Sequence, residues 1–167
     1  MMPLRASVLY RVVLLCCAGV LIAACQTPPP AKRLSAEQIQ ILREIGFHRE
    51  EDGWGFDLDG RLLFDSNAST LSAPNRETIA RLVKVVTEIG IEHLRIEGHA
   101  DGSGRKRINN KLSRRRAEAV AREIARNGIP YENITVRSFG ATSPVGDNTT
   151  REGRALNRRV VIIVPSE

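Results

Sequence analysis

Apolar and polar residues alternate from about residue 60 onward in segments that are typical of strands and amphipathic helices. In residues 74–89 apolar side chains recur at helical spacing, and Pro74 suits the first turn of a helix. Because helices alternate with strands, we expect right-handed βαβ connections and a two-layer α+β sandwich. The predicted strands are 61–65, 92–97, 133–139 and 160–164, and the predicted helices are 74–89, 109–127 and a short extra helix at 153–157.

The predicted helix at 109–127 is rich in arginine, and helical geometry separates these arginines into two groups. With Leu112 set at zero and about 100° per residue, the apolar side chains fall between about 80° and about 140° and define the buried stripe. Arg116 falls near 40°, beside Asn109 and Ser113 on the flank of that stripe (about 60° and about 100°). The other basic side chains fall between about 200° and about 300°, on the solvated face: Lys111, Arg114, Arg115 and Arg122.

A glycine-rich loop, G-H-A-D-G-S-G from Gly98, precedes this helix and contains one carboxylate, Asp101. A guanidinium held beside the core on the first turns of a helix is placed for a bidentate contact with a carboxylate. Asp101 supplies the opposite charge nearby. We therefore expect Asp101 and Arg116 to hold a ligand that carries both an ammonium and a carboxylate group.

The same loop offers little support for catalysis. His99 and Asp101 lie two residues apart with Ser103 and Ser113 close by, but the chain has no G-x-S-x-G motif and the loop has no second carboxylate. His93, His99 and Asp101 lack a recognised metal-ligand spacing, and G-S-G-R-K lacks the Walker frame. We expect His99 to be a packed residue that orients the loop, and we expect neither an enzyme nor a cofactor.

A further segment, residues 34–56, precedes this pattern. Ser35 and Gln38 have the spacing of a capping box, apolar residues then recur at helical spacing, and Gly46 suits the end of a helix. The run E-E-D-G-W-G-F that follows contains the only tryptophan. The apolar side chains of the segment either pack onto the main domain or form a patch that is exposed to a partner protein, and they are Leu42, Phe47, Trp54 and Phe56.

The first 25 residues predict the compartment. Arg5 and Arg11 accompany an apolar run of 13 residues, 12–24, which is too short to span a bilayer and has the length of a signal-peptide core. The run ends in L-I-A-A-C, which resembles the lipobox of bacterial lipoproteins, so residues 1–24 are expected to be removed and Cys25 to carry lipid, palmitate included. Gln26 then points to the outer membrane in the Gram-negative sorting scheme that this resemblance implies. The alternative is a secreted protein cut at the same place.

Charge adds little once the compartment is considered. The chain has 25 basic and 19 acidic residues, a net charge of +6, and loss of two arginines with the leader leaves 23 against 19, or +4. A basic surface suits nucleic acid or the anionic cell envelope, and the predicted location excludes nucleic acid. Residues 26–33 form a proline-rich tether that reaches about 25 Å when extended. One cysteine remains after processing, so no internal disulfide is expected.

Two long blocks resemble the OmpA-like peptidoglycan-binding domain. They are G-H-A-D-G-S-G…I-N-N-K-L-S-R-R-R-A and P-V-G-D-N-T-T-R-E-G-R-A-L-N-R-R-V, and the resemblance covers roughly residues 60–165. It implies a βαβαββ sandwich with a mixed sheet, in which Asp101 and Arg116 bind the diaminopimelate of the peptidoglycan peptide stem. Arg158 is either structural or part of the ligand site. The expected peptidoglycan-binding residues are Asp101, Arg116, Asn109, Gly104, Asn67 and Arg158.

The blocks L-S-A-E-Q-I-Q-I-L-R-E-I-G-F and E-D-G-W-G-F resemble the YfiB family of signalling outer-membrane lipoproteins. This resemblance implies sequestration of a periplasmic repressor of the YfiR type, which releases the inner-membrane diguanylate cyclase YfiN and raises cyclic-di-GMP. The alternative is a passive anchor between outer membrane and peptidoglycan, and a homodimer is left open. The expected partner-binding residues are Leu42, Phe47, Trp54, Phe56, Glu44 and Ile45.

These predictions divide the chain into a leader (1–24), a lipidated tether (25–33), a partner segment (34–57) and the OmpA-like domain (58–167). If residues 34–56 unfolded from the domain, they would add up to about 75 Å of reach and expose the apolar patch. Peptidoglycan binding is expected to favour that extended state. Leu42→Pro is therefore expected to strengthen partner binding even without peptidoglycan.

Overall fold

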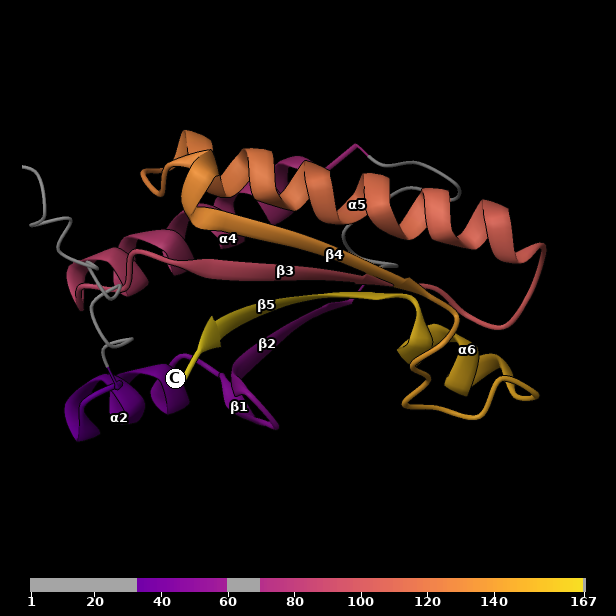
Figure 1. Ribbon diagram of the computed structural model, residues 1–167, viewed down its shortest axis with the longest axis horizontal. Coiled ribbons are helices and arrows are strands. Elements are labelled where there is room, and N and C mark those ends of the chain that lie inside the picture. Colours follow the sequence, from indigo (N-terminus) through magenta and orange to yellow (C-terminus); the bar gives the residue numbers. More distant parts are fainter. Residues whose placement is uncertain (1–32, 60–69, 167) are drawn as a thin grey trace, which may run out of the picture. The chain divides into compact units, whose positions relative to one another are not determined.

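The computed structural model describes residues 33–59 and 70–166 of the chain. The predicted strand at 61–65, the leader 1–24, Cys25 and Asn67 lie outside these residues. The helices predicted at 74–89 and 109–127 are confirmed, although the second begins three residues earlier than predicted, and the short helix begins two residues earlier than predicted. The elements in chain order are α2 (Ala36–Glu44), β1 (His48–Glu50), β2 (Gly53–Asp59), α4 (Ala73–Glu88), β3 (Leu94–His99), α5 (Lys106–Arg126), the 3₁₀ turn η1 (Tyr131–Asn133), β4 (Ile134–Gly140), α6 (Arg151–Asn157) and β5 (Arg159–Pro165) (Figure 1).

The five strands form one mixed sheet in the order β1-β2-β5-β3-β4. β3 and β4 are parallel and are joined through α5, whereas the other neighbouring strands are antiparallel. The last strand, β5, therefore lies in the middle of the sheet and pairs with β2 on one side and β3 on the other. This confirms the predicted α+β sandwich with a mixed sheet.

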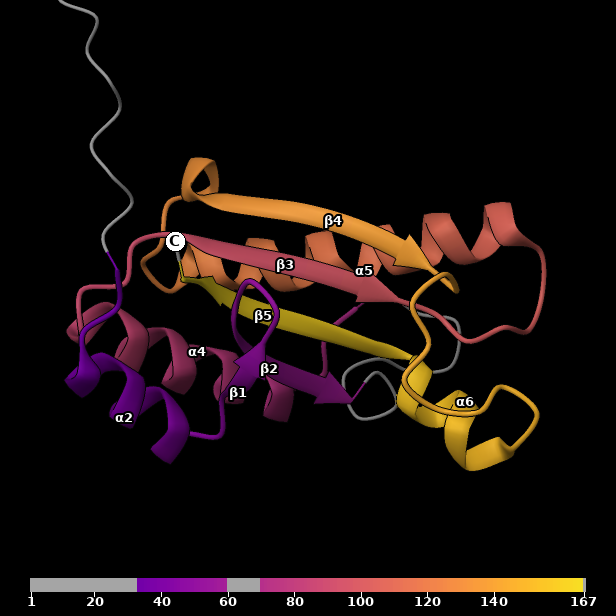
Figure 2. The ribbon, with the colours of Figure 1, turned by 60° about the horizontal axis from the view of Figure 1, so that its bottom comes forward.

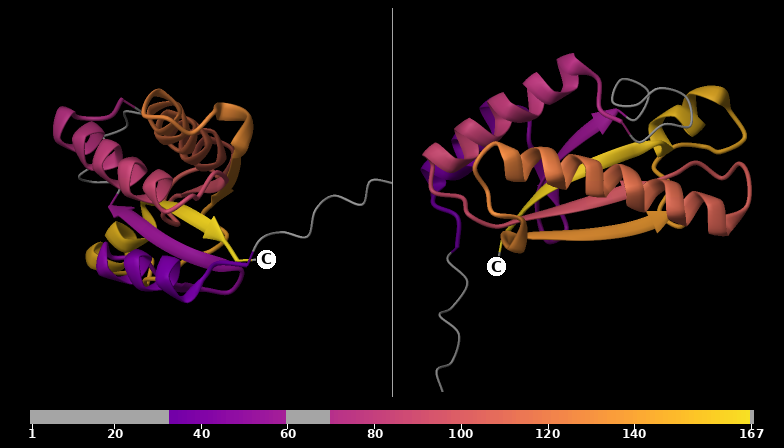
Figure 3. Two further views of the ribbon diagram at one scale, coloured as in Figure 1. Left: turned by 90° about the vertical axis from the view of Figure 1, so that its left-hand side faces the viewer. Right: turned by 90° about the horizontal axis from the view of Figure 1, so that it is seen from above.

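The two faces of the sheet differ in what covers them. Along β5, Val160, Ile162 and Val164 belong to the hydrophobic core together with residues of α4 and α5, while Val161 and Ile163 point to the opposite face. α4 and α5 cover the first face, and Figure 2 shows them behind the sheet with the other face toward the viewer. The views in Figure 3 show the same two helices side by side over the strands. Within the described part of the chain, no helix combines the length and hydropathy needed to cross a bilayer.

Close approach of α5 to β3 depends on Gly98. A Cβ atom at this position would lie against the backbone carbonyl of Ser113, well inside contact distance. Ser113 is buried and its hydroxyl is 2.8 Å from that of Ser138 on β4. The absence of a side chain at Gly98 therefore lets the helix sit directly on the two parallel strands, close to the loop that carries Asp101.

The N-terminal segment is integrated into this fold. Ser35 and Gln38 form the predicted capping box, with Gln38 N–H donating to Ser35 Oγ and Ser35 N–H donating to Gln38 Oε1. β2 is paired with β5 from Gly53 to Asp59, so the boundary predicted between residues 57 and 58 falls inside a continuous strand. A release of the whole segment 34–56 would remove this strand from the sheet. In this structure the segment packs onto the domain, as the first of the two interpretations expects.

Candidate ligand-binding site

The loop between β3 and α5 is fastened around the carboxylate of Asp101. Ser103 donates two hydrogen bonds to Asp101 Oδ1, from its backbone N–H at 2.9 Å and from its hydroxyl. Asn109 Nδ2, on the first turn of α5, donates to the backbone carbonyls of Asp101 (3.0 Å) and Ser103 (2.7 Å). Gly104 adopts a φ of 81°, a conformation that favours glycine. The predicted residues Asn109 and Gly104 thus shape the loop from within.

Arg158 brings the second sequence block to this loop. It lies between α6 and β5, and its Nη1 donates to Asp101 Oδ2 at 2.5 Å. About a quarter of the Arg158 side chain is exposed, whereas the Asp101 side chain is buried to nine-tenths. Of the two roles left open for Arg158, the structure therefore shows a direct contact with the predicted site carboxylate.

Arg116 lies on the inner side of α5, as its helical angle predicts. It is 6% exposed, while the basic residues on the other side of the helix, Lys111, Arg114, Arg115 and Arg122, are exposed. Burial lowers the pKa of Arg116, the positive charge of Arg158 lowers it further, and the negative charge of Asp101 opposes both effects. Arg116 is thus within electrostatic reach of both Asp101 and Arg158.

The charge of Asp101 is maintained despite its burial. Burial by itself would raise the pKa of this carboxyl, but the hydrogen bonds from Ser103 and Arg158 outweigh it and hold the pKa below its usual range. At neutral pH the cluster therefore combines one carboxylate with two guanidinium groups. The excess of one positive charge suits an anionic ligand group, and the carboxylate suits a cationic one.

A pair of asparagines, which the sequence analysis did not identify, supports the far side of the loop. Asn148 Oδ1 accepts hydrogen bonds from Gly102 N–H at 2.7 Å and from Asn157 Nδ2 at 2.9 Å. Asn157 is completely buried, and its Oδ1 accepts from the backbone N–H groups of Val145 (2.7 Å) and Gly146 (2.8 Å). Both asparagines fall in the second block that resembles the OmpA-like domain, which is the only sequence signal for them.

The residues considered for catalysis have structural contacts. His99 is 4% exposed and stacks on Phe139 with ring centroids 5.1 Å apart. Ser103 donates its hydroxyl to Asp101, and Ser113 lies against Ser138. The described residues contain no group of three or more histidine, cysteine or acidic side chains that could hold a metal ion.

The residues predicted to bind a partner lie elsewhere, in and around α2. Leu42 is fully buried, and Phe47 and Trp54 are 3% exposed. Phe56 is half-buried and packs on Phe47, with ring centroids 5.4 Å apart. Ile45 is also half-buried, and Glu44 is exposed. In this conformation the apolar part of the predicted partner surface belongs to the core.

Two contacts fasten α2 to the rest of the domain besides Leu42. Gln38 Nε2 donates to the backbone carbonyl of Ile89, directly after α4, at 2.7 Å. The guanidinium of Arg43 lies over the ring of Trp54 at 5.0 Å, and Arg49 lies 5.8 Å from the same ring. α2 is thus held to the end of α4 by Gln38 and to Trp54 by Arg43.

Comparison with known proteins places these features in a family. The model of the OmpA family matches residues 63–158. The outer-membrane lipoprotein YfiB of Pseudomonas aeruginosa is 45% identical over 146 residues, 87% of each chain. The putative lipoprotein YfiB of Escherichia coli is 31% identical over 147 residues, 87% of this chain and 91% of that protein. Among solved structures, the cell wall anchor of the T6SS from Pseudomonas aeruginosa is similar with a TM-score of 0.66 and 25% identity, covering 77% of this chain and 96% of that one.

Proposed function

The chain belongs to the OmpA family and is an outer-membrane lipoprotein of the YfiB type, and on that premise we propose that it binds peptidoglycan through the Asp101 cluster. We define the Asp101 cluster as Asp101, Arg116 and Arg158. The observation that carries the proposal is the charge of this cluster, one buried carboxylate beside two guanidinium groups. The cluster serves binding and not catalysis.

Diaminopimelate matches the cluster group by group. It carries an ammonium group next to a carboxylate at the end of its side chain, so Asp101 would accept from the ammonium while the arginines would donate to the carboxylate. Ser103 and Asn109 hold the loop in place before a ligand arrives, which lowers the entropic cost of binding. The proposed ligand is therefore the peptide stem, and the glycan strands would contribute less to recognition.

Neighbouring arginines on α5 provide a matched test. Arg116→Gln removes the buried guanidinium, whereas Arg115→Gln removes an exposed one from the adjacent position and the same net charge. In a pull-down with purified peptidoglycan sacculi, we expect the Arg116→Gln protein to stop co-sedimenting with the sacculi and the Arg115→Gln protein to co-sediment like wild type. Asp101→Asn should stop co-sedimenting as well. If both arginine variants co-sedimented with the sacculi to the same extent, binding would depend on general positive charge and not on the Asp101 cluster.

For the finer function, we propose that the protein captures a YfiR-type repressor and thereby releases YfiN, which raises cyclic-di-GMP. Support comes from the identity to YfiB lipoproteins and from the buried apolar side chains beneath α2. Undocking of α2 would expose Leu42, Phe47 and Trp54 to the partner. A passive outer membrane–peptidoglycan anchor is the competing function, and it requires no movement of α2.

Release is confined to a shorter segment than the sequence suggested. β2 is hydrogen-bonded to β5 along its length, so only residues 34–47 can leave without breaking the central sheet. These are about 14 residues, which extend to roughly 46 Å at about 3.3 Å each. This is less than the 75 Å expected for residues 34–56, at about 3.3 Å each, but it still adds substantially to the reach of the tether.

Gln38 allows docking to be separated from helix formation. Its Oε1 closes the capping box with Ser35, while its Nε2 binds the carbonyl of Ile89. Gln38→Glu keeps the acceptor for the capping box and removes the donor to Ile89. We expect this variant to bind the purified repressor more tightly than wild type. Unchanged affinity for both Gln38→Glu and Leu42→Pro would leave the passive anchor as the function.

A further inference from the structure

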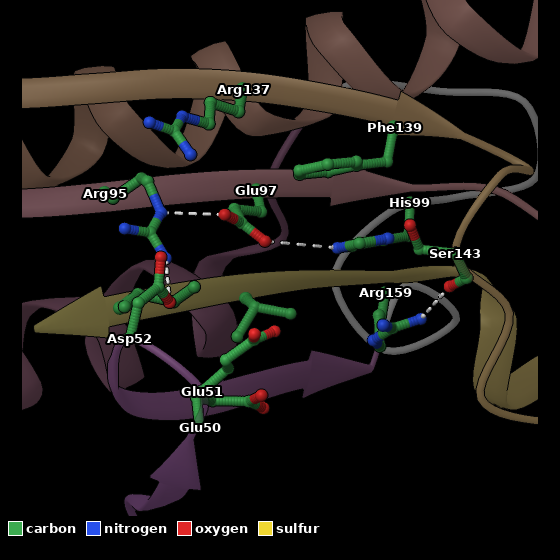
Figure 4. Close-up of a pocket in the computed structure, with 12 residues that line it drawn as sticks. Glu50, Glu51, Asp52, Arg95, Glu97, His99, Arg137, Phe139, Ser143 and Arg159 are labelled. Atoms are coloured by element: carbon green, nitrogen blue, oxygen red, sulfur yellow. Dashed lines mark hydrogen bonds and ion pairs between the residues drawn. The ribbon is translucent and has the colours of Figure 1, made fainter. Parts of the chain in front are cut away.

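A pocket lies on the sheet face that α4 and α5 leave open. Its volume is about 310 Å³, and no member of the Asp101 cluster is among its described lining residues. Strands β3, β4 and β5 form its floor, and the β1–β2 turn with Glu50, Glu51 and Asp52 forms one rim (Figure 4). The pocket is therefore distinct from the proposed peptidoglycan site.

The floor of the pocket is an ion-pair network in which one guanidinium contacts two carboxylates. Arg95 donates from Nε to Glu97 Oε1 at 2.7 Å and from Nη2 to Asp52 Oδ1 at 2.6 Å. The Arg95 and Glu97 side chains are about nine-tenths buried. This network connects β3 to the β1–β2 turn and occupies the guanidinium of Arg95, so a ligand would meet the charged side chains at the edges of the pocket.

The edges of the pocket carry opposite charges. Arg137 on β4 and Arg159 on β5 supply guanidinium groups at two different edges of the pocket, and the turn supplies the carboxylates of Glu51 and of Glu50, which also contacts His48 Nε2 at 2.9 Å (Figure 4). The contacts of Arg159 are long, 3.5 Å to Asp57 Oδ1 and 3.5 Å to the carbonyl of Ser143. The charges of Glu50 and Glu97 also act on Arg159. Arg137 is exposed, so its guanidinium is accessible to an incoming carboxylate.

His99 is a buried polar group inside this pocket that lacks good hydrogen bonds. Its Nδ1 has no hydrogen-bond partner, and its Nε2 lies 3.7 Å from Glu97 Oε2, beyond hydrogen-bond distance. Stacking on Phe139 holds the ring nearly parallel, with an interplanar angle of 5°. Buried polar groups are normally paired, and an unpaired one lowers stability. A ligand with a polar group at this point would satisfy the imidazole.

We infer that this pocket binds a small zwitterion, either a free amino acid or a dipeptide. The carboxylate of the ligand meets Arg137, its ammonium meets Glu51, and an amide or hydroxyl group pairs with His99. A dipeptide extends to about 7 Å, and the pocket volume of about 310 Å³ accommodates it. The protein would therefore bind a small molecule at a site that is separate from its peptidoglycan site.

Titration with L-alanyl-L-alanine, followed by NMR of the ring protons of His99, tests the inference on the fragment Arg33–Glu167, which forms one compact unit with its own core. We expect saturable shifts of the His99 signals. N-acetyl-alanyl-alanine and alanyl-alanine amide each lack one of the two charges and should bind at least about tenfold more weakly, as expected for loss of a charged hydrogen bond. Equal binding of the dipeptide and both capped forms, or no saturable shift, would overturn the inference.

Substitutions of exposed residues separate the two sites. Arg137→Gln and Glu51→Gln change exposed side chains and should each weaken dipeptide binding about tenfold or more. His99→Phe keeps a ring on Phe139 and removes both nitrogens, so it should weaken binding while preserving the fold. Asp101→Asn should bind the dipeptide like wild type even if it loses peptidoglycan. Dipeptide shifts that vanish in Asp101→Asn and persist in Arg137→Gln would place the ligand in the Asp101 cluster instead.

Discussion

Replacement of Leu42 by alanine should undock α2 and expose its buried face to a partner. Unlike Leu42→Pro, it should do so without breaking the helix. Leu42 is completely buried in the core, and truncation of such a leucine to alanine costs ~2 to 5 kcal/mol. The lower figure alone is enough to raise the undocked fraction of α2 about 30-fold, because 1.4 kcal/mol corresponds to a factor of ten. The domain core beneath α4 and α5 does not depend on α2 for its strand pairing.

Partner affinity should follow the undocked fraction. When only the undocked state binds, the apparent dissociation constant is the intrinsic constant divided by the fraction of competent molecules. Leu42→Ala should therefore raise the competent fraction by about 30-fold, up to the point at which α2 is mostly undocked, and tighten repressor binding by less than that, because the variant also removes the leucine from the partner surface. Gln38→Glu removes one hydrogen bond and should tighten binding by about 2- to 10-fold.

The single tryptophan of the chain provides the assay for docking. Trp54 is 3% exposed and lies under Arg43 of α2, so undocking should shift its emission to longer wavelength. Repressor affinity is measured by calorimetry on the same samples. Gln40→Ala is the control. Gln40 is exposed, and its side chain donates a hydrogen bond to Glu44 of the same helix. A red shift in both Leu42→Ala and Gln38→Glu with repressor affinity of both within about twofold of wild type would refute the coupling.

Three further changes test the site and its supports. The pKa of Asp101 is held below its ordinary value of 3.8, so its contribution to stability is present above that pH and lost as the pH falls through the lower folded pKa; Asp101→Asn should flatten this acid limb in urea titrations. Asn157→Ala leaves two backbone N–H groups without their acceptor and should lower the free energy of unfolding by about 3 kcal/mol or more, measured by urea denaturation. Gly98→Ala drives a methyl group into the carbonyl of Ser113 and should cost about 1 to 3 kcal/mol, with thermal melting as the readout.

The helical angle of Arg116 was enough to predict its burial, because a long amphipathic helix has a regular period and a wide apolar stripe. The same argument placed Lys111 and Arg115 on the exposed side, where the structure has them. Two blocks that resemble a known domain also identified Arg158, whose contact with Asp101 joins positions 57 residues apart. Local periodicity alone cannot show such a contact.

The strand that contains Trp54 was not predicted, for a different physical reason. The run G-W-G-F-D-L-D alternates, with Trp54, Phe56 and Leu58 on one face, but it contains two glycines, which are uncommon inside strands. Those glycines are needed for packing, since a Cβ atom at Gly53 would meet the carbonyl of Val164. Asn157 was beyond prediction for a similar reason, because its partners lie 9 to 12 residues away in an irregular loop.

The most direct test of the Asp101 cluster compares two ligands that differ by one carboxylate. A muropeptide with diaminopimelate and the same muropeptide with lysine in its place are titrated against the fragment Arg33–Glu167 and its Arg116→Gln variant. We predict that wild type binds the diaminopimelate form at least about tenfold more tightly, because this form makes an additional hydrogen bond between charged groups. The Arg116→Gln variant should lose this preference. Equal affinity of wild type for both ligands would contradict the account.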